Sequence, residues 1–297
     1  MSKIISVTGA TGNVGSKVAE QLIAKGYQVR VIGRNQAKLE RFVALGAEAF
    51  VGDLSNTAFL TKAFAGTDGV FMMLPADVTS TDVVAQLTST VKSEVAAIRN
   101  SHVKQVVFLS TVGAALPEKG GVIQASQLAE KLLNELDGVN VVHLRPGYFM
   151  ENFFGSIPLI KTANINGGPL LSDISISLVA TQDVAVAAVK RFEAQSAPDK
   201  IVQYVLGERD LTLSEATVIL GKSIDKPQLQ YVPFSLEDAK NAFLSFGMSE
   251  NFVDSYLENM KDINEDRVFK EYTRTSDNTT STSIEQFVDT FAAVYNT

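Results

Sequence analysis

The first half of the chain alternates short, almost wholly apolar runs with longer amphipathic segments. Apolar runs rich in β-branched residues are typical of strands buried on both faces of a parallel sheet, and apolar residues repeated every three or four positions are typical of helices. Strands are expected at Ile4–Thr8, Gln28–Ile32, Ala47–Val51, Gly69–Met73, Gln105–Leu109 and Val139–Leu144, and helices at Val14–Ala24, Gln36–Leu45, Asn56–Ala65, Thr79–Asn100 and Gln124–Leu136. This order predicts an α/β fold with right-handed βαβ crossovers and a doubly wound parallel sheet of the Rossmann kind.

After Pro146 the alternation becomes irregular. Gly167-Gly168-Pro169 is expected to form a turn, and Thr181 is expected to cap a helix. The other elements expected here are helices at Thr181–Phe192, Ser214–Leu220, Ser235–Met260 and Ile284–Tyr295, a strand at Ile201–Leu206 and a loose loop at Thr273–Ser283. We therefore expect one domain over residues 1–150. A small α/β cap subdomain is expected over residues 151–297, with segments around 175–206 returning to the core of the first domain.

Composition and charge narrow the range of functions. The chain has 297 residues, a formal charge of −7, two histidines and no cysteine. A negative chain has no overall attraction for nucleic acid, and the absence of thiols excludes disulfides, thiolate metal sites and cysteine nucleophiles. No apolar run approaches the roughly 18 residues of a membrane span, and the N-terminus is too short before its first turn for a signal peptide. We expect a cytoplasmic protein, monomeric or a homodimer, with no metal, membrane or nucleic-acid partner.

A glycine-rich loop joins the first expected strand to the first expected helix. Gly9 permits a sharp turn, Gly12 lets the backbone approach a pyrophosphate, and Gly15 lets the helix pack closely on the sheet. The helix N-terminus offers free N–H groups and a positive dipole end to phosphate. Residues 1–150 are thus predicted to bind a dinucleotide, with an ordinary tight turn as the alternative. The contacts expected from this loop are Gly9, Thr11, Gly12, Asn13, Val14 and Gly15.

The residues after the second strand distinguish between the two nicotinamide cofactors. In NAD sites an acidic residue at this point holds the ribose 2′-hydroxyl, but here the strand ends in Gly33-Arg34-Asn35. Arg34, and Lys38 one helical turn later, are placed to pair with a 2′-phosphate. NADP(H) is therefore favoured over NAD(H). The alternative is that both side chains are solvated residues at the start of a helix.

The glycine spacing resembles that of the extended and atypical short-chain dehydrogenases/reductases, whose loop commonly reads TGATGxxG. This resemblance implies that Asp53, followed by Leu54, lies beside the adenine ring; its alternative role is to cap the helix beginning near Asn56. Met73 and Leu74 follow the fourth strand. They are expected to line the ribose and adenine side of the cofactor, or else to fill the core.

The usual catalytic pair of that superfamily is missing. Its reductases place a Ser or Thr at the end of the fifth strand, which Ser110 and Thr111 match, and a Tyr-x-x-x-Lys on the next helix. None of the seven tyrosines has a lysine four residues later. The aligned positions are Val122 and Ser126, and Glu130 is interpreted as solvent-facing or a ribose-side contact. Carbonyl reduction by the usual mechanism is therefore not expected.

The segment after the sixth strand is similar to the LRPxxFxEN segment of the NmrA-like family, which lies within the atypical short-chain reductases. That family includes quinone and dye reductases and redox-sensing regulators, and many members lack Tyr-x-x-x-Lys. The resemblance covers nearly the whole chain. It implies that Pro146, Tyr148 and Phe149 border the nicotinamide and, with Phe153, form a pocket, while Tyr148 and Asn152 orient the substrate. Core packing is the alternative for Tyr148 and Phe149.

Two function classes remain after these observations. The leading hypothesis is an NAD(P)H-dependent oxidoreductase that transfers hydride to a small conjugated acceptor, such as a quinone or dye. Catalysis would rest on proximity and orientation at the cofactor, with Tyr148 or water supplying a proton. The alternative is a non-catalytic NADP(H)-binding redox sensor. A sugar-nucleotide epimerase ranks last because it normally needs Tyr-x-x-x-Lys. The candidate catalytic residues are Tyr148, Ser110 and Asn152.

Overall fold

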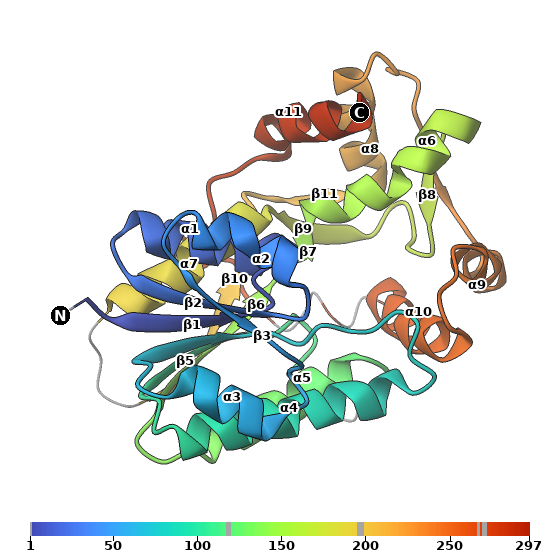
Figure 1. Cartoon of the computed structure of the whole chain (residues 1–297). Coiled ribbons are helices and arrows are strands. Elements are labelled where there is room, and N and C mark those ends of the chain that lie inside the picture. Colours follow the sequence, from blue (N-terminus) through green and yellow to red (C-terminus); the bar gives the residue numbers. More distant parts are fainter. Residues whose placement is uncertain (1, 117–119, 195–198, 266–267, 269–271) are drawn as a thin grey trace.

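A parallel sheet lies at the centre of the molecule (Figure 1). The computed structural model describes residues 2–116, 120–194, 199–265, 268 and 272–297. Within these residues, seven strands form one sheet in the order β10-β6-β5-β4-β1-β2-β3. They are β1 (Ile4–Thr8), β2 (Gln28–Gly33), β3 (Glu48–Val51), β4 (Gly69–Met72), β5 (Gln105–Leu109), β6 (Asn140–Pro146) and β10 (Lys200–Val205). All neighbouring strands run parallel, so the predicted doubly wound α/β fold is confirmed.

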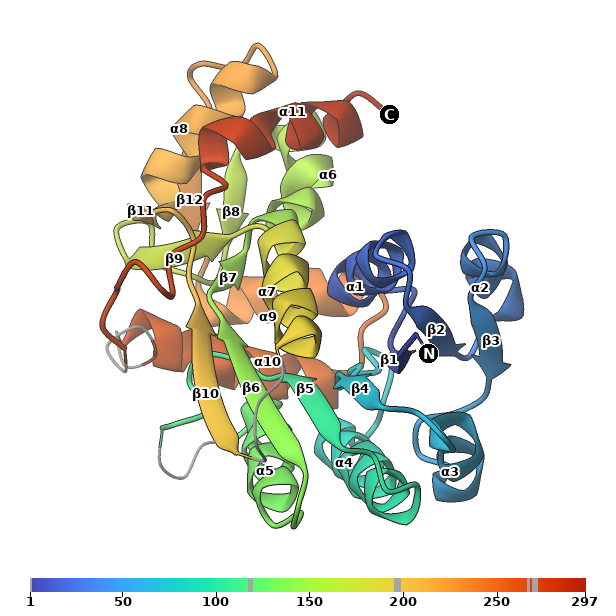
Figure 2. The same cartoon turned by 90° about the vertical axis from the view of Figure 1, so that its left-hand side faces the viewer.

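Helices cover both faces of this sheet. Helices α1, α2 and α7 lie on one face, and α3, α4 and α5 lie on the other (Figures 1 and 2). Their bounds are α1 (Asn13–Ala24), α2 (Gln36–Val43), α3 (Thr57–Phe64), α4 (Val83–Asn100), α5 (Ile123–Asn134) and α7 (Thr181–Glu193). Strand β1 pairs with both β2 and β4, so the order of strands reverses between β1 and β4. Ligands of open α/β sheets bind in the crevice beyond the carboxyl ends of the strands at such a reversal.

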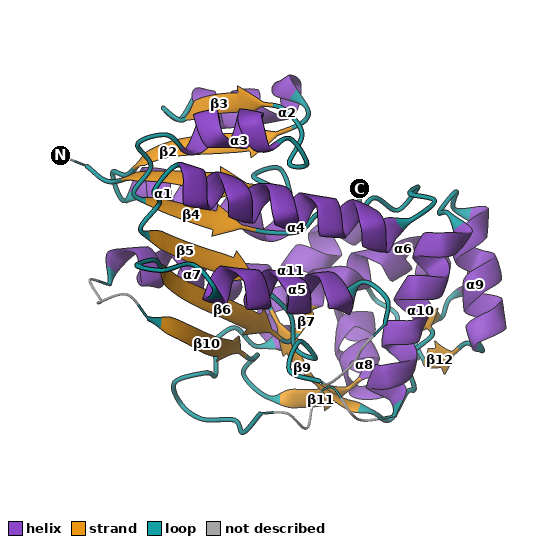
Figure 3. Cartoon of the chain, turned by 90° about the horizontal axis from the view of Figure 1, so that it is seen from below, coloured by secondary structure: helices purple, strands orange, loops and turns teal. Residues whose placement is uncertain are grey.

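The remaining elements form a cap beyond the carboxyl ends of the strands, and the arrowheads of β4, β5 and β6 point toward it (Figure 3). The cap contains a three-stranded sheet, β11-β9-β7, and a parallel pair, β8 and β12. The bounds are β7 (Tyr148–Phe149), η1, a 3₁₀ helix (Met150–Ser156), α6 (Ile157–Ala163), β8 (Asn166–Gly168), β9 (Ser175–Val179), β11 (Asp210–Thr212), α8 (Leu213–Ser223), β12 (Tyr231–Pro233), α9 (Leu236–Ser245), α10 (Glu250–Asn264) and α11 (Ile284–Tyr295). Within residues 175–206, α7 and β10 join the main sheet layer, whereas β9 pairs with β7 and β11. The domain division at residue 150 stays a prediction.

Three local predictions are wrong, each because a tertiary contact or a backbone angle overrides the sequence pattern. The helix expected over Ser235–Met260 is two helices, α9 and α10, separated where Gly247 adopts a φ of +80°. The turn expected at Gly167-Gly168-Pro169 is largely strand β8, which pairs with β12. Thr181 is the first residue of α7 and not its cap, since Ala180 takes the N-cap position.

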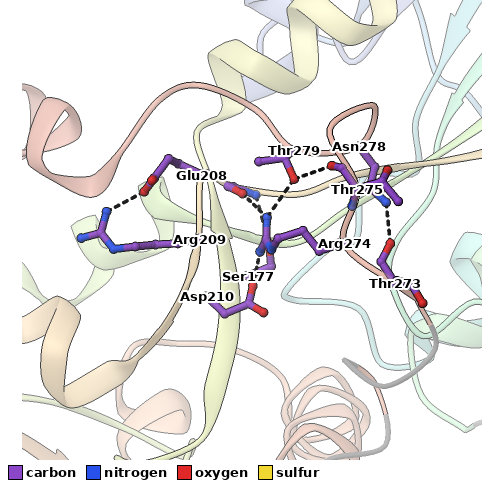
Figure 4. Close-up of polar contacts among 10 residues, drawn as sticks. Ser177, Glu208, Arg209, Asp210, Thr273, Arg274, Thr275, Asn278 and Thr279 are labelled. Carbon is purple, nitrogen blue, oxygen red and sulfur yellow. Dashed lines mark hydrogen bonds and ion pairs between the residues drawn. The ribbon is translucent and has the colours of Figure 1, made fainter.

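The segment expected as a loose loop over Thr273–Ser283 is anchored to the cap sheet (Figure 4). The Arg274 guanidinium donates to the Gly207 carbonyl and pairs with the Asp210 carboxylate, and it lies 3.3 Å from the Ser177 hydroxyl oxygen. Leu206 forms a parallel bridge with Thr279. These bonds tie the segment that leads into α11 to the junction between β10 and β11.

Two further features of the fold bear on function. No helix of the described residues is long and apolar enough to cross a membrane. The same residues contain no group of three or more His, Asp or Glu side chains arranged to hold a metal ion.

Candidate active site

The glycine-rich loop adopts a conformation that requires glycine at two of its positions. Gly9 has a φ of +62°, in the left-handed region, and its carbonyl accepts the Gly12 N–H at 2.9 Å. A Cβ at Gly15 would collide with the Gly9 carbonyl oxygen, so only glycine permits this approach of α1 to the loop. The loop brings the N-terminus of α1 to the carboxyl edge of the sheet, where β1 ends.

This N-terminus is open to a ligand. Gly12 is the N-cap of α1, no side chain caps the helix, and its first turn contains no acidic residue. By contrast, side chains cap the N-termini of the neighbouring helices: Asn35 caps α2, Asn56 caps α3 and Asp82 caps α4. Unpaired N–H groups at the positive end of the helix dipole are suited to bind a phosphate. Of the predicted loop residues, Val14 is buried in the core through its side chain, so only its backbone amide belongs to this open end.

Arg34 and Lys38 are both exposed at the edge formed by β2 and α2. Two carboxylates accompany Arg34. Hydrogen bonds from Ser55 lower the pKa of Asp53, and those from Thr79 lower the pKa of Asp77; the Arg34 charge acts in the same direction on both. Sequence reasoning missed Asp77, which follows β4 in a loop without a motif. The carboxylates of Asp53 and Asp77 thus both lie within electrostatic reach of the Arg34 guanidinium.

Asp53 and Leu54 follow β3, as predicted, but their environments differ. The Asp53 carboxylate accepts bonds from the Ser55 amide and hydroxyl, both at 2.7 Å. The cap of α3 is Asn56, which accepts the Phe59 N–H, so the alternative capping role of Asp53 is wrong. The Leu54 side chain is buried in the core and leaves only its backbone for a ligand.

A cavity of about 370 Å³, here called the sheet-edge cavity, lies between the carboxyl ends of β4, β5 and β6 and helix α10. Eight of the predicted site residues line it: Met73, Leu74, Ser110, Thr111, Pro146, Tyr148, Phe149 and Asn152. The Met73 side chain also lies against Gly9, so the cavity begins beside the glycine-rich loop. Helix α10 adds Tyr256, Asn259 and Met260, which no sequence motif marks. The structure thus brings together residues from both halves of the chain.

Helix α5 presents apolar and small residues to the cavity where the short-chain reductases carry their catalytic pair. Val122 and Ser126, the positions aligned with Tyr and Lys, both line the sheet-edge cavity. The start of α5 therefore borders the cavity, but at these two positions it offers neither a phenol nor an ammonium group. Any acid for catalysis has to come from another element or from water.

Ser110 belongs to a buried ionic network. Its hydroxyl donates to Glu130 Oε1 at 2.5 Å, and Arg145 binds both carboxylate oxygens, from Nε at 3.0 Å and from Nη2 at 2.6 Å. Burial alone would raise the pKa of Glu130, but the bonds from Arg145 and Ser110 lower it. The interpretation of Glu130 as solvent-facing or a ribose-side contact is therefore wrong. Arg145 also donates to the Tyr204 hydroxyl at 3.0 Å. The Ser110 hydroxyl therefore uses its proton in the bond to Glu130. Its oxygen can still accept a hydrogen bond from a ligand.

Tyr148 lies at the border between the sheet and the cap. Its ring meets Phe153 edge to face at 6.4 Å between centroids. Burial raises the pKa of Tyr148 well above its usual value, with Tyr256 acting in the same direction and the nearby Asn152 side chain in the opposite one. The phenol therefore stays protonated at neutral pH and is available as a hydrogen-bond donor.

Glu151, which sequence reasoning did not select, fixes the Tyr148–Asn152 segment in place. Both of its oxygens accept the Thr181 amide at 3.1 Å, and Lys17 from α1 pairs with it at 3.1 Å. The carboxylate thus occupies the N-terminus of α7 and links that helix to α1. Glu151 is the acidic residue of the LRPxxFxEN segment, and this motif could have marked it from the sequence alone.

Comparison with known proteins agrees with this geometry. A family model described as NAD(P)H-binding matches residues 9–194. The NAD(P)H azoreductase of Xenophilus azovorans is 26% identical over 255 residues, covering 86% of this chain and 85% of the azoreductase. Quinone oxidoreductase 2 of Escherichia coli K12 is 26% identical over 253 residues, covering 84% and 85%.

A solved structure extends this agreement to the fold. The crystal structure of an NADPH-dependent quinone oxidoreductase from Escherichia coli, complexed with NADPH, superposes with a TM-score of 0.80 at 23% identity, over 97% of this chain and 99% of that one. The resemblance to the NmrA-like reductases and the prediction of a nicotinamide dinucleotide site are confirmed. With its open α1 terminus and its cavity beside the strand reversal, the chain belongs to the NAD(P)H-binding family of Rossmann-fold proteins.

Proposed function

We propose that this protein is an NADPH-dependent reductase that transfers hydride to a small conjugated acceptor such as a quinone or an azo dye. The observation that carries the proposal is the apolar sheet-edge cavity, which has Val122 and Ser126 at the positions of the usual Tyr and Lys. Reduction of a simple ketone places charge on one oxygen and needs an acid beside it. A conjugated acceptor spreads that charge, so a cavity without the acid pair favours such substrates.

The cofactor is proposed to lie along the carboxyl edge of the sheet. The open end of α1 would hold the pyrophosphate, while Arg34 and Lys38 would hold the 2′-phosphate of NADPH. Asp53 and Leu54 would lie on the adenine side. The nicotinamide end would lie in the sheet-edge cavity, against Met73, Leu74, Ser110, Thr111, Pro146, Tyr148 and Phe149.

The residues of the cavity would then bind, orient and shield the acceptor. Bound NADPH supplies a hydride, which is two electrons and a hydrogen nucleus. A quinone becomes a hydroquinone when it accepts that hydride and one proton. Tyr148, which like any tyrosine is protonated at neutral pH, or water would give the proton, and Asn152 would orient the acceptor beside it. The names of the similar azoreductase and quinone oxidoreductase support this class of acceptor.

The test is direct. Purified protein is mixed with NADPH and, separately, with methyl-1,4-benzoquinone and the azo dye methyl red, and loss of the reduced-cofactor absorbance is followed. We expect turnover that needs both protein and acceptor. Tight NADPH binding with no oxidation by either acceptor would contradict the proposal and favour a cofactor-binding sensor.

A further inference from the structure

A second cavity of about 310 Å³, here called the cap chamber, adjoins the sheet-edge cavity. Tyr148, Asn152, Tyr256 and Met260 line both spaces, so the two meet at these side chains. Each volume lies near the lower end of the range of about 300–1,000 Å³ that is usual for small-molecule sites. A ligand that occupies both would therefore be larger than a single quinone ring.

The walls of the cap chamber are mostly apolar and aromatic, with the polar side chains of Asn152, Ser156 and Asn166 among them. None of the described residues that line it is charged. Helix α9 contributes Ala239, Ala242, Phe243 and Phe246, which recur at the spacing of a single helix face. Phe246 is 71% exposed, the largest exposed fraction among the big apolar side chains described. Helix α9 packs on α10 at the outer end of the cap (Figure 3), so this face borders the chamber.

One polar side chain of the lining has an unpaired buried acceptor. Asn166, from β8, is 1% exposed, and its Nδ2 donates to the Thr217 hydroxyl at 2.8 Å. Its Oδ1 has no hydrogen-bond partner among the described residues. A buried acceptor without a donor is unfavourable, and a ligand that brings a donor removes that penalty. The chamber thus combines a mostly apolar wall with a buried acceptor, Asn166 Oδ1, that has no partner among the described residues.

We propose that the cap chamber holds an apolar arm of the hydride acceptor, and that a hydroxyl or N–H group on this arm donates to Asn166 Oδ1. This inference rests on the proposed function and narrows its substrate class to alkyl- or prenyl-substituted conjugated acceptors. The acceptor ring would lie in the sheet-edge cavity, and the arm would pass between Tyr148 and Tyr256.

Three matched quinones test the arm: methyl-1,4-benzoquinone, hexyl-1,4-benzoquinone and (6-hydroxyhexyl)-1,4-benzoquinone. We expect kcat/KM with NADPH to be about tenfold higher for the hexyl than for the methyl compound, the gain from burying about two methylenes. The terminal hydroxyl should add about a further threefold through its hydrogen bond. Equal kcat/KM for the methyl and hexyl compounds in the wild-type protein would overturn the inference and leave the proposed function intact.

Variants connect these preferences to the chamber. Ala242→Phe fills the space from α9 and should reduce the hexyl-to-methyl ratio toward one, whereas Asn241→Phe, at an exposed position of the same helix, should keep the wild-type ratio. Asn166→Leu should remove the preference for the hydroxyhexyl over the hexyl compound. Because each result is a ratio measured within one variant, partial loss of folded protein does not affect it. Wild-type ratios in Ala242→Phe would contradict the assignment.

Binding measurements separate the two proposals. Calorimetry with saturating NADP⁺ gives the dissociation constants of the methyl and hexyl compounds without turnover. Tighter hexyl binding that Ala242→Phe abolishes, with no quinone reduced, would support the chamber and refute the reductase function. No difference in binding and no turnover would refute both.

Discussion

Individual side chains determine what the sheet edge accepts. Arg34 stands at the end of β2, where an NAD site would carry a carboxylate, and its nearest acidic neighbours come from other loops. Burial raises the pKa of Tyr148, whereas the Ser110 hydroxyl donates its hydrogen bond to Glu130. These two hydroxyl groups of the cavity lining therefore differ in what they offer a ligand.

Arg34→Ala is expected to weaken NADPH binding by about tenfold to a hundredfold, the effect of losing one charge-assisted hydrogen bond. NADH affinity should change little because NADH has no 2′-phosphate. Fluorescence titration with each cofactor measures both. Arg41→Ala, which removes an exposed arginine from the last turn of α2, the helix that follows Arg34, is the control. An equal loss for the two cofactors would place Arg34 elsewhere than at the 2′-phosphate.

Tyr148→Phe tests the proton donor. If the phenol gives the proton, kcat for quinone reduction should fall about a hundredfold, within the usual range for general acid catalysis. The wild-type rate should also stay flat through the ordinary range of tyrosine pKa values, because burial raises that of Tyr148. Tyr231→Phe serves as control, since that hydroxyl donates to the Leu170 carbonyl at 3.1 Å. Unchanged turnover in Tyr148→Phe would make water the donor.

Among the elements, helix α4 carries a buried carboxylic acid, Glu94, whose burial is unfavourable. Glu94 is fully buried, and neither carboxylate oxygen has a hydrogen-bond partner among the described residues. Burial raises its pKa well above the usual value, with the Thr8 hydroxyl acting in the opposite direction. The folded state therefore holds a proton that the unfolded chain releases above its ordinary pKa. Stability falls as the pH rises through the range between the two values.

Glu94→Gln removes this dependence. Relative to the wild-type protein, the variant should gain about 2–4 °C in Tm for each kcal/mol of lost penalty, and the gain should be larger at pH 8 than at pH 5. Differential scanning calorimetry at both values measures it. Glu40→Gln, at an exposed position of α2, should show no such difference. The same change in Tm at both pH values would show that the Glu94 proton is not retained on folding.

The molecule as a whole joins the layer of the parallel sheet to a cap, and the sheet-edge cavity lies between them. The sheet supplies one wall through Met73 and Ser110, and α10 supplies the other through Tyr256 and Met260. The chain passes between the sheet and the cap several times. Where it passes from β10 to β11, Arg274 binds the Gly207 carbonyl and the Asp210 carboxylate (Figure 4).

Arg274→Met is expected to lower Tm by about 2–4 °C for each kcal/mol that the anchor contributes, and bonds to charged groups contribute about 1.5–3 kcal/mol. Arg209→Met is the matched control. Both arginines pair with exposed carboxylates, Asp210 for Arg274 and Glu208 and Glu285 for Arg209, but Arg274 also binds the buried Gly207 carbonyl and Ser177 hydroxyl. Exposed ion pairs contribute about 0–1 kcal/mol. Thermal unfolding curves compare the two variants. A loss in Arg274→Met no greater than in Arg209→Met would show that the anchor does not stabilise the fold.

Features set by local physics could be predicted from the amino-acid order alone. The six N-terminal strands and their helices follow from periodicity, and the glycine-rich loop follows from backbone angles that favour glycine at Gly9 and from the closeness of Gly15 to Gly9. The prediction failed where the same residues suit two conformations. Ser235–Met260 has an apolar pattern compatible with a single helix, but Gly247 ends the first one and Ser249 caps the second.

Contacts between distant residues could not be predicted, because packing decides which side chains meet. The pairing of Arg145 with Glu130 links β6 to α5, and Tyr256 reaches Tyr148 from more than a hundred positions away along the chain. Periodicity shows that a residue is buried or on a helix, but not what it faces. The sequence by itself was enough for the fold class and for the class of cofactor, a nicotinamide dinucleotide. The shape of the cavity, the state of each polar group in it and the cap chamber depend on how the cap folds back over the sheet.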